Sequence, residues 1–110
     1  MSVEDKISVE DKIKEQIGSS TVMLYMKGTP QFPQCGFSGQ AVQILQTCET
    51  EFASVDVLAD PEIRQGIKDF SNWPTIPQLY INGQFVGGCD IMVEMFQKGE
   101  LQKMVADTQG

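Results

Sequence analysis

A single cysteine stands where a loop gives way to a predicted helix, in the segment QFPQCGFSGQ at 31–40. The residue is Cys35, and the position three residues later, which carries the second cysteine of a C-x-x-C dithiol motif, is Ser38. Unpaired N–H groups and the positive end of the helix dipole favour a thiolate at such a site. Lys27, at the end of the preceding predicted strand, adds a nearby positive charge. We therefore predict that Cys35 is a nucleophile or a metal ligand.

Ser38 cannot resolve a mixed disulfide, so a dithiol cycle within this motif is excluded. A second thiol must come from glutathione, from Cys89 or from another subunit. The third cysteine, Cys48, falls on the apolar stripe of the predicted helix, and we expect it to belong to the core. The chain contains no histidine, which excludes Ser-His-Asp and Cys-His catalysis and any histidine metal ligand.

The composition is that of one ordinary globular domain of 110 residues. A net charge of −7 argues against binding to nucleic acid or to an anionic membrane surface. No apolar run reaches the roughly 20 residues that a membrane span needs, and the acidic start MSVEDKISVEDKIKEQ lacks the features of a secretory signal. Three cysteines, an odd number, indicate thiol chemistry or metal ligation in a reducing compartment, and we expect the cytoplasm.

The hexapeptide SVEDKI occurs twice in succession, at 2–7 and 8–13. Six residues rotate a helix by a net angle of about 240°, so the two copies cannot share one helical face. Val9, Ile13 and Ile17 form one stripe, which Val3 and Ile7 do not join. We therefore expect residues 1–8 to be a frayed extension without function, and residues 9–110 to be the folded domain.

The remaining pattern alternates strands and helices. We predict strands at 22–26, 52–57, 78–81 and 84–86, and helices from 9, over 35–48, from 60 to about 70, from 90 and over 100–107. Asn82-Gly83 predicts a type I′ hairpin turn, and Gly99 predicts a break between the last two helices. The first two strands flank a helix and are expected to be parallel. This predicts an α/β fold with a four-stranded mixed sheet and helices on both faces.

The chain contains three separate motifs that are typical of one protein family. They are K-G-T-P-x-x-P-x-C-G-F-S at 27–38, W-P-T-I-P-Q at 73–78 and G-G-C-D at 87–90. Together they resemble the monothiol, CGFS-type glutaredoxins of the single-domain form, in the same order, from about Ile17 to Val105. The resemblance implies a thioredoxin fold. It also implies that Pro77 is the cis-proline of that fold.

The resemblance further implies a site for glutathione. Lys27 and Arg64 would hold the glycine carboxylate, and the backbone of Ile76 would pair with the cysteinyl part like a short added strand. Cys89 and Asp90, at the start of the last long helix, would hold the γ-glutamyl end.

Two chains that each supply Cys35 and one glutathione thiolate provide the four sulfur ligands of a [2Fe–2S] cluster. The resemblance thus implies a homodimer bridged by the cluster, which carries clusters from an assembly scaffold to acceptor apoproteins. It also implies a BolA-type partner, which would have to bring its own ligand.

The main alternative is a glutathione-dependent thiol–disulfide oxidoreductase in which Cys35 is the nucleophile. The seven residues GTPQFPQ between Lys27 and Cys35 form a longer loop than we expect in dithiol glutaredoxins. The resemblance implies that this loop favours the carrier and leaves at most weak enzymatic activity. Cys89 matches the family's second cysteine, and a disulfide with Cys35 under oxidising conditions is a further hypothesis.

Overall fold

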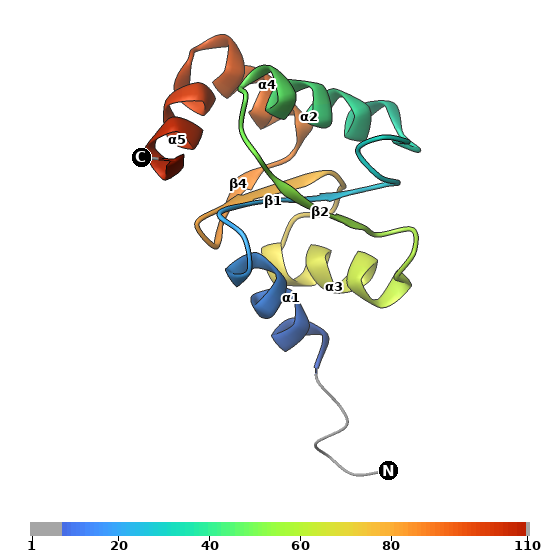
Figure 1. Ribbon diagram of the computed structural model, residues 1–110. Helices are drawn as coiled ribbons and strands as arrows, with labels where there is room; N and C mark the ends of the chain where they lie inside the picture. Colours follow the sequence, from blue (N-terminus) through green and yellow to red (C-terminus); the bar gives the residue numbers. More distant parts are fainter. Residues whose placement is uncertain (1–7, 110) are drawn as a thin grey trace, which may run out of the picture.

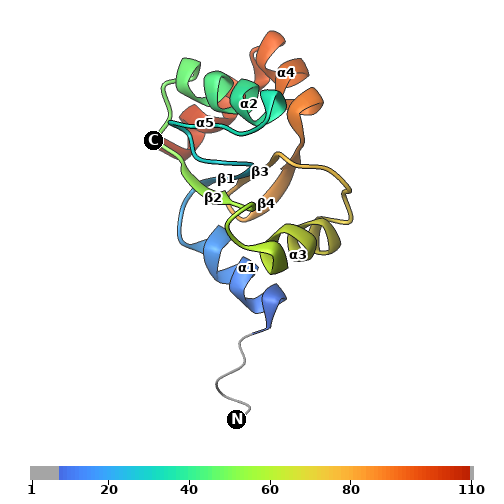
Figure 2. The ribbon, with the colours of Figure 1, turned by 90° about the vertical axis from the view of Figure 1, so that its right-hand side faces the viewer.

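The computed structural model describes residues 8–109 and has a four-stranded sheet covered by helices on both faces (Figure 1). The elements, in chain order, are α1 (Val9–Gly18), β1 (Val22–Met26), α2 (Gly36–Thr47), β2 (Ala53–Asp56), α3 (Pro61–Ser71), β3 (Gln78–Ile81), β4 (Gln84–Gly87), α4 (Cys89–Gln97) and α5 (Glu100–Gln109). Helices α1 and α3 lie on one face, and α2, α4 and α5 on the other, as the turned view in Figure 2 also shows. The predicted architecture is confirmed.

The strand order is β2-β1-β3-β4, with β1 and β2 parallel and the other two pairings antiparallel. The parallel register, from Met23 opposite Ala53 to Met26 opposite Asp56, follows from the crossover through α2. All five residues of β1 are buried, because helices cover both faces of this inner strand. Strand β2 is one residue shorter at each end than predicted. At its end the Asp56 carboxylate accepts hydrogen bonds from the N–H groups of Gly28 and Leu58, which turns the chain away.

Two hydrophobic cores form because alternate residues of β1 point to opposite faces of the sheet. Val22, Leu24 and Met26 pack under α2, α4 and α5, while Met23 and Tyr25 pack over α1 and α3. The first core positions the start of α2, and the second positions α3. The candidate site described below lies where these two helices approach the same end of the sheet.

Helix α1 docks through the stripe predicted from the second hexapeptide. Ile13 is fully buried, Ile17 is nearly so, and Val9 packs against the same core. The helix comes so close to α3 that a Cβ atom on Gly66 would collide with the Val9 side chain. Ser8 caps the helix by accepting a hydrogen bond from the N–H of Asp11 at 3.0 Å. Residues 1–7 lie outside the described residues, so the frayed extension expected at 1–8 stays a prediction for them, whereas Ser8 belongs to the cap of α1.

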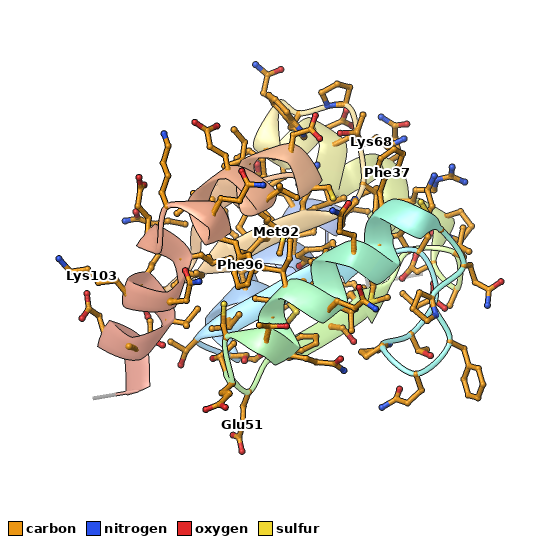
Figure 3. All side chains as sticks on the ribbon, turned by 90° about the horizontal axis from the view of Figure 1, so that it is seen from above. Phe37, Glu51, Lys68, Met92, Phe96 and Lys103 are labelled. Carbon is orange, nitrogen blue, oxygen red and sulfur yellow. The ribbon has the colours of Figure 1, made fainter. Side chains whose placement is uncertain are left out.

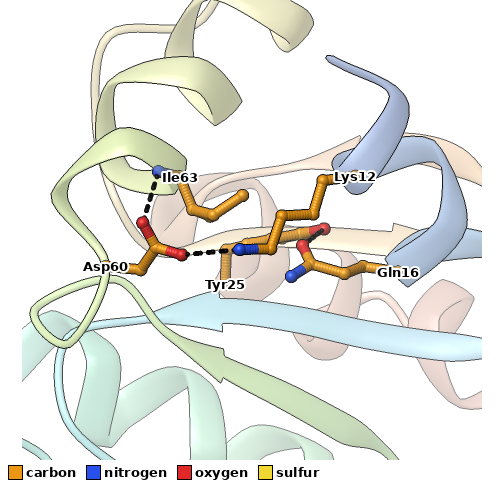
Figure 4. A network of polar contacts seen from close by, with 5 residues as sticks. All are labelled: Lys12, Gln16, Tyr25, Asp60 and Ile63. Carbon is orange, nitrogen blue, oxygen red and sulfur yellow. Dashed lines mark hydrogen bonds and ion pairs between the residues drawn. The ribbon is translucent and has the colours of Figure 1, made fainter. Parts of the chain in front are cut away.

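Polar contacts also join α1 to the rest of the domain (Figure 4). The Lys12 ammonium donates to the carboxylate of Asp60, which also caps α3 by accepting from the N–H of Ile63. These two partners hold the pKa of Asp60 below its ordinary value, with Lys12 the larger cause. The Tyr25 hydroxyl donates to Gln16 at 2.8 Å, and burial raises the pKa of Tyr25.

The predicted hairpin turn and the predicted break between the last two helices are both present. Asn82 and Gly83 both have positive φ angles, 53° and 77°, as a type I′ turn requires. Gly99 has a φ of 76° and separates α4 from α5. Helix α4 begins at Cys89, one residue earlier than predicted. No helix within residues 8–109 is long and apolar enough to cross a membrane.

Candidate functional site

A cavity of about 390 Å³ opens where the end of β1, the start of α2, α3 and the start of α4 meet. Its lining consists of Lys27, Cys35, Phe37, Lys68, Trp73, Pro74, Thr75, Ile76, Pro77, Gly88, Cys89, Asp90 and Ile91. Phe37 of α2 and Lys68 of α3 both line it, and seen from above they lie at the same end of the molecule (Figure 3). The cavity therefore gathers three of the sequence motifs into one place.

The loop between Lys27 and Cys35 is a closed turn that fixes the approach to α2. The Gln34 N–H donates to the Lys27 carbonyl at 2.9 Å, and Thr29 and Phe32 bond to each other within the loop. Gly28 has a φ of 91°, and a Cβ there would lie 2.7 Å from the Gln34 nitrogen. Only glycine fits this backbone without strain, so Gly28 lets the turn close and hold Cys35 beside the end of β1.

Cys35 is the N-cap of α2 and is partly exposed. Its pKa is lowered, and the N–H group of Ser38 is the largest cause. The Phe37 N–H and the positive charge of Lys27 act in the same direction, whereas partial burial opposes them. The structure therefore gives Cys35 the thiolate character expected of a thiol at a helix N-terminus.

Ser38 has a structural role that the sequence did not reveal. Its side chain is fully buried, and its hydroxyl accepts a hydrogen bond from the Lys27 N–H at 3.0 Å. The same hydroxyl can donate to the thiolate of Cys35, and this bond also contributes to the lowered pKa. The serine in place of a second cysteine thus ties β1, the loop and the reactive thiol together.

The segment before β3 forms the opposite wall of the cavity. The Ile76–Pro77 peptide bond is cis, as the resemblance implied. The Gln78 side chain is fully buried and donates to the carbonyl groups of Trp73 and Thr75, which fixes the segment. Within the described chain no hydrogen bond engages the backbone N–H or C=O of Ile76. An extended ligand in the cavity can therefore pair with this backbone.

Cys89 and Asp90 form the third side, at the start of α4. Cys89 is buried, and its thiol donates to the Gln40 side-chain oxygen, with 3.2 Å between sulfur and oxygen. Burial raises the pKa of Cys89, and the negative charges of Asp90 and Cys35 add to the increase. The two thiols of the cavity therefore differ: the pKa of Cys35 is lowered, and the pKa of Cys89 is raised.

Of the six site residues predicted from the sequence, five line the cavity: Lys27, Cys35, Ile76, Cys89 and Asp90. Arg64 does not line it but lies exposed on α3. Lys68, one turn further along the same helix, supplies a cation instead. Lys68 was not among the predicted residues, although it follows Arg64 by four positions and so lies on the same helical face. Cys48 is half-buried, packs against the core under α2 and has a pKa raised by burial.

The family follows from a direct comparison. The sequence model of the glutaredoxin family matches residues 22–86, which include β1, α2 and the hairpin. The chain belongs to the glutaredoxins. It is 52% identical over 98 residues to Glutaredoxin 4 of Haemophilus ducreyi, which covers 89% of this chain and 92% of the relative. It is 60% identical over 85 residues to a probable monothiol glutaredoxin, GrlA, of Legionella pneumophila. This match covers 77% of this chain and 96% of the relative.

A solved structure supports the same assignment. Reduced apo GrxS14 of poplar superposes with a TM-score of 0.80 at 48% sequence identity, over 93% of this chain and 94% of that one. The thioredoxin fold and the monothiol class inferred from the three motifs are thereby confirmed. Ser38, in place of the second cysteine of C-x-x-C, distinguishes this glutaredoxin's site from a dithiol site.

Proposed function

We infer that this monothiol glutaredoxin carries a [2Fe–2S] cluster as cargo, shared between two copies of the chain, and passes it from an assembly scaffold to acceptor apoproteins. The observation that carries the proposal is that Ser38 replaces the second thiol of the motif beside Cys35, whose pKa is lowered. Within residues 8–109, no group of three or more His, Cys, Asp or Glu side chains could hold a metal ion. A cluster that needs four thiolates must then draw its other ligands from outside one chain.

Glutathione fits the cavity as the source of the additional thiolate. The unpaired backbone of Ile76 faces a ligand that is itself a short peptide. Lys27 and Lys68 offer positive charge for the glycine carboxylate, and Arg64, one turn before Lys68 on α3, adds positive charge from outside the cavity lining. At the other end, the N-terminus of α4 suits the γ-glutamyl carboxylate, and Asp90 suits its ammonium group. We propose that these residues, with Cys89, bind glutathione beside Cys35.

The surroundings of the cavity suit a second protein chain. Phe37 is 61% exposed and Trp73 is 40% exposed, and both line the cavity. Phe32, in the loop before Cys35, is 74% exposed. Exposed aromatic side chains around a functional site are typical of a protein interface. We propose that a second copy covers them in the cluster-bound homodimer, in the cytoplasm, and that a BolA-type partner can replace this copy if it brings its own ligand.

The alternative function is the reduction of mixed disulfides between proteins and glutathione. The lowered pKa of Cys35 favours this chemistry too, because the thiolate is the nucleophile. Rapid Cys35-dependent turnover of a glutathionylated peptide, with glutathione as the reductant, would support the enzyme. Slow turnover together with cluster binding would support the carrier.

The proposal is tested by anaerobic reconstitution with ferrous iron, sulfide and glutathione, followed by visible absorption. We expect a coloured protein only when glutathione is present, and no colour with Cys35→Ser. Cys48→Ser is the matched control, since Cys48 packs against the core outside the cavity, and it should bind the cluster normally. Absence of colour in the unmodified protein would reject the carrier and favour the oxidoreductase.

A further inference from the structure

The second thiol of the cavity is engaged by a residue outside it. Gln40 lies exposed on α2, and its side-chain oxygen receives the hydrogen of the Cys89 thiol. The two residues are 49 positions apart in the chain, so this bond depends on the packing of α2 against α4. Gln40 itself is absent from the lining of the cavity that contains Cys35 and Cys89.

The bond has a consequence for the chemistry of Cys89. A thiol takes part in disulfide exchange only as a thiolate whose sulfur approaches in line with the bond that it attacks. Donation to Gln40 keeps the hydrogen on Cys89 and directs the S–H bond towards α2. Cys89 must break this contact before its sulfur can act on Cys35.

We propose that Gln40 is a positioning residue that holds Cys89 away from the chemistry of Cys35 and thereby limits how fast the two thiols close a disulfide. The burial of Cys89 acts in the same direction. While the contact holds, only Cys35 reacts, although a second cysteine lines the same cavity. When the contact breaks, Cys89 becomes available as the resolving thiol that Ser38 cannot be.

The closure needs a disulfide as oxidant. The Cys35 thiolate attacks one sulfur of an aromatic disulfide, which forms a mixed disulfide and releases one aromatic thiolate. Cys89 then loses its proton to water and attacks the Cys35 sulfur, which forms the Cys35–Cys89 bond and expels the second aromatic thiolate. Two cysteine thiols are oxidised, and one aromatic disulfide is reduced to two thiols.

The two steps can be followed separately with one equivalent of the disulfide of nitrothiobenzoate, because the released thiolate absorbs visible light. The protein carries Cys48→Ser in every case, so that only the two cavity thiols react. The first phase reports Cys35, and the second phase reports closure by Cys89. Cys89→Ser should remove the second phase and leave the first.

Two substitutions at Gln40 should change the second phase in opposite directions. Loss of a hydrogen bond between neutral groups favours ionisation of the Cys89 thiol by about fivefold. The more acidic thiol is also a weaker nucleophile, which reduces the gain in the closure rate. In Gln40→Ala the disulfide should therefore close about twofold faster. Gln40→Glu provides a charged and stronger acceptor and should close more slowly. Gln43 is exposed on the same helix, so Gln43→Ala and Gln43→Glu are matched controls that should leave the second phase unchanged.

An unchanged or slower second phase in Gln40→Ala overturns the proposal; a slower one would show that Gln40 promotes closure. Absence of a second phase in both the unmodified protein and Gln40→Ala would overturn it as well, because the two thiols would then not meet. The experiment contains neither glutathione nor iron. Its outcome is therefore independent of whether the protein carries clusters.

Discussion

The buried hydroxyl of Ser38 provides the sharpest test of how the site is built. Ser38→Ala removes the acceptor for the Lys27 N–H and leaves this group unpaired in a half-buried position. An unsatisfied buried donor costs about 1–3 kcal/mol, and the partial exposure of Lys27 favours the lower half of that range. We therefore expect the free energy of unfolding to fall by about 1–2 kcal/mol. For a domain of this size, Tm should fall by roughly 5–10 °C.

The same change should make Cys35 less reactive. The Ser38 N–H, the largest cause of the lowered pKa, remains in the alanine variant, but the bond from the hydroxyl is lost. The pKa of Cys35 should rise, so the thiolate fraction at neutral pH should fall. Alkylation by iodoacetamide should slow by up to about tenfold, since the lost bond runs from a hydroxyl to a charged thiolate but is the smallest cause of the lowered pKa. At a pH above both pKa values the variant should react at least as fast, because its thiolate is then the stronger nucleophile.

Chemical denaturation and alkylation rates across pH measure both effects in a Cys48→Ser, Cys89→Ser background. Ser19→Ala is the control, because its hydroxyl is exposed and should change stability by no more than about 0.5 kcal/mol. Unchanged stability and unchanged alkylation of Ser38→Ala would refute the reasoning. It would mean that the backbone alone holds the thiol beside β1.

Three further predictions concern the supporting structure and the thiols. Asp60→Ala should destabilise the protein by about 1 kcal/mol through loss of the α3 cap. Since the folded-state pKa of Asp60 is lowered, this difference in stability should be present above about pH 4 and should disappear as the pH falls through the lowered pKa. Denaturation across pH measures it. Ile13→Ala, in a fully buried position, should cost about 2–5 kcal/mol, whereas the same substitution at the exposed Lys14 should cost little. In competitive alkylation at neutral pH followed by mass mapping, Cys35 should be modified well before Cys89, and preferential modification of Cys89 would contradict the assigned pKa directions.

Local patterns in the sequence predicted most of the fold. The stripe of Val9, Ile13 and Ile17 and the Asn82-Gly83 turn depend on neighbouring residues alone, and both were correct. The end of β2 was misplaced because it depends on Asp56 reaching Gly28, a contact between distant segments. Such contacts are set by packing and leave no local signal in the sequence.

In the site, too, features set by local motifs were predicted, and features set by contacts between distant segments were not. Five of the six predicted residues line the cavity because they belong to motifs with fixed spacing. Lys68 was missed because the geometry of α3, rather than any motif, decides which cation faces the cavity. The contact between Gln40 and Cys89 left no signal in the sequence, because it depends on the packing of α2 against α4.

The central claim is that one thiolate per chain suffices because the cluster is shared. Native mass spectrometry of the anaerobically reconstituted protein tests it most directly. The account predicts a species with the mass of two chains, two glutathione molecules and one [2Fe–2S] cluster, because Cys35 and glutathione together supply four thiolates. A cluster bound to a single chain, or a cluster-bound dimer without glutathione, would contradict the account.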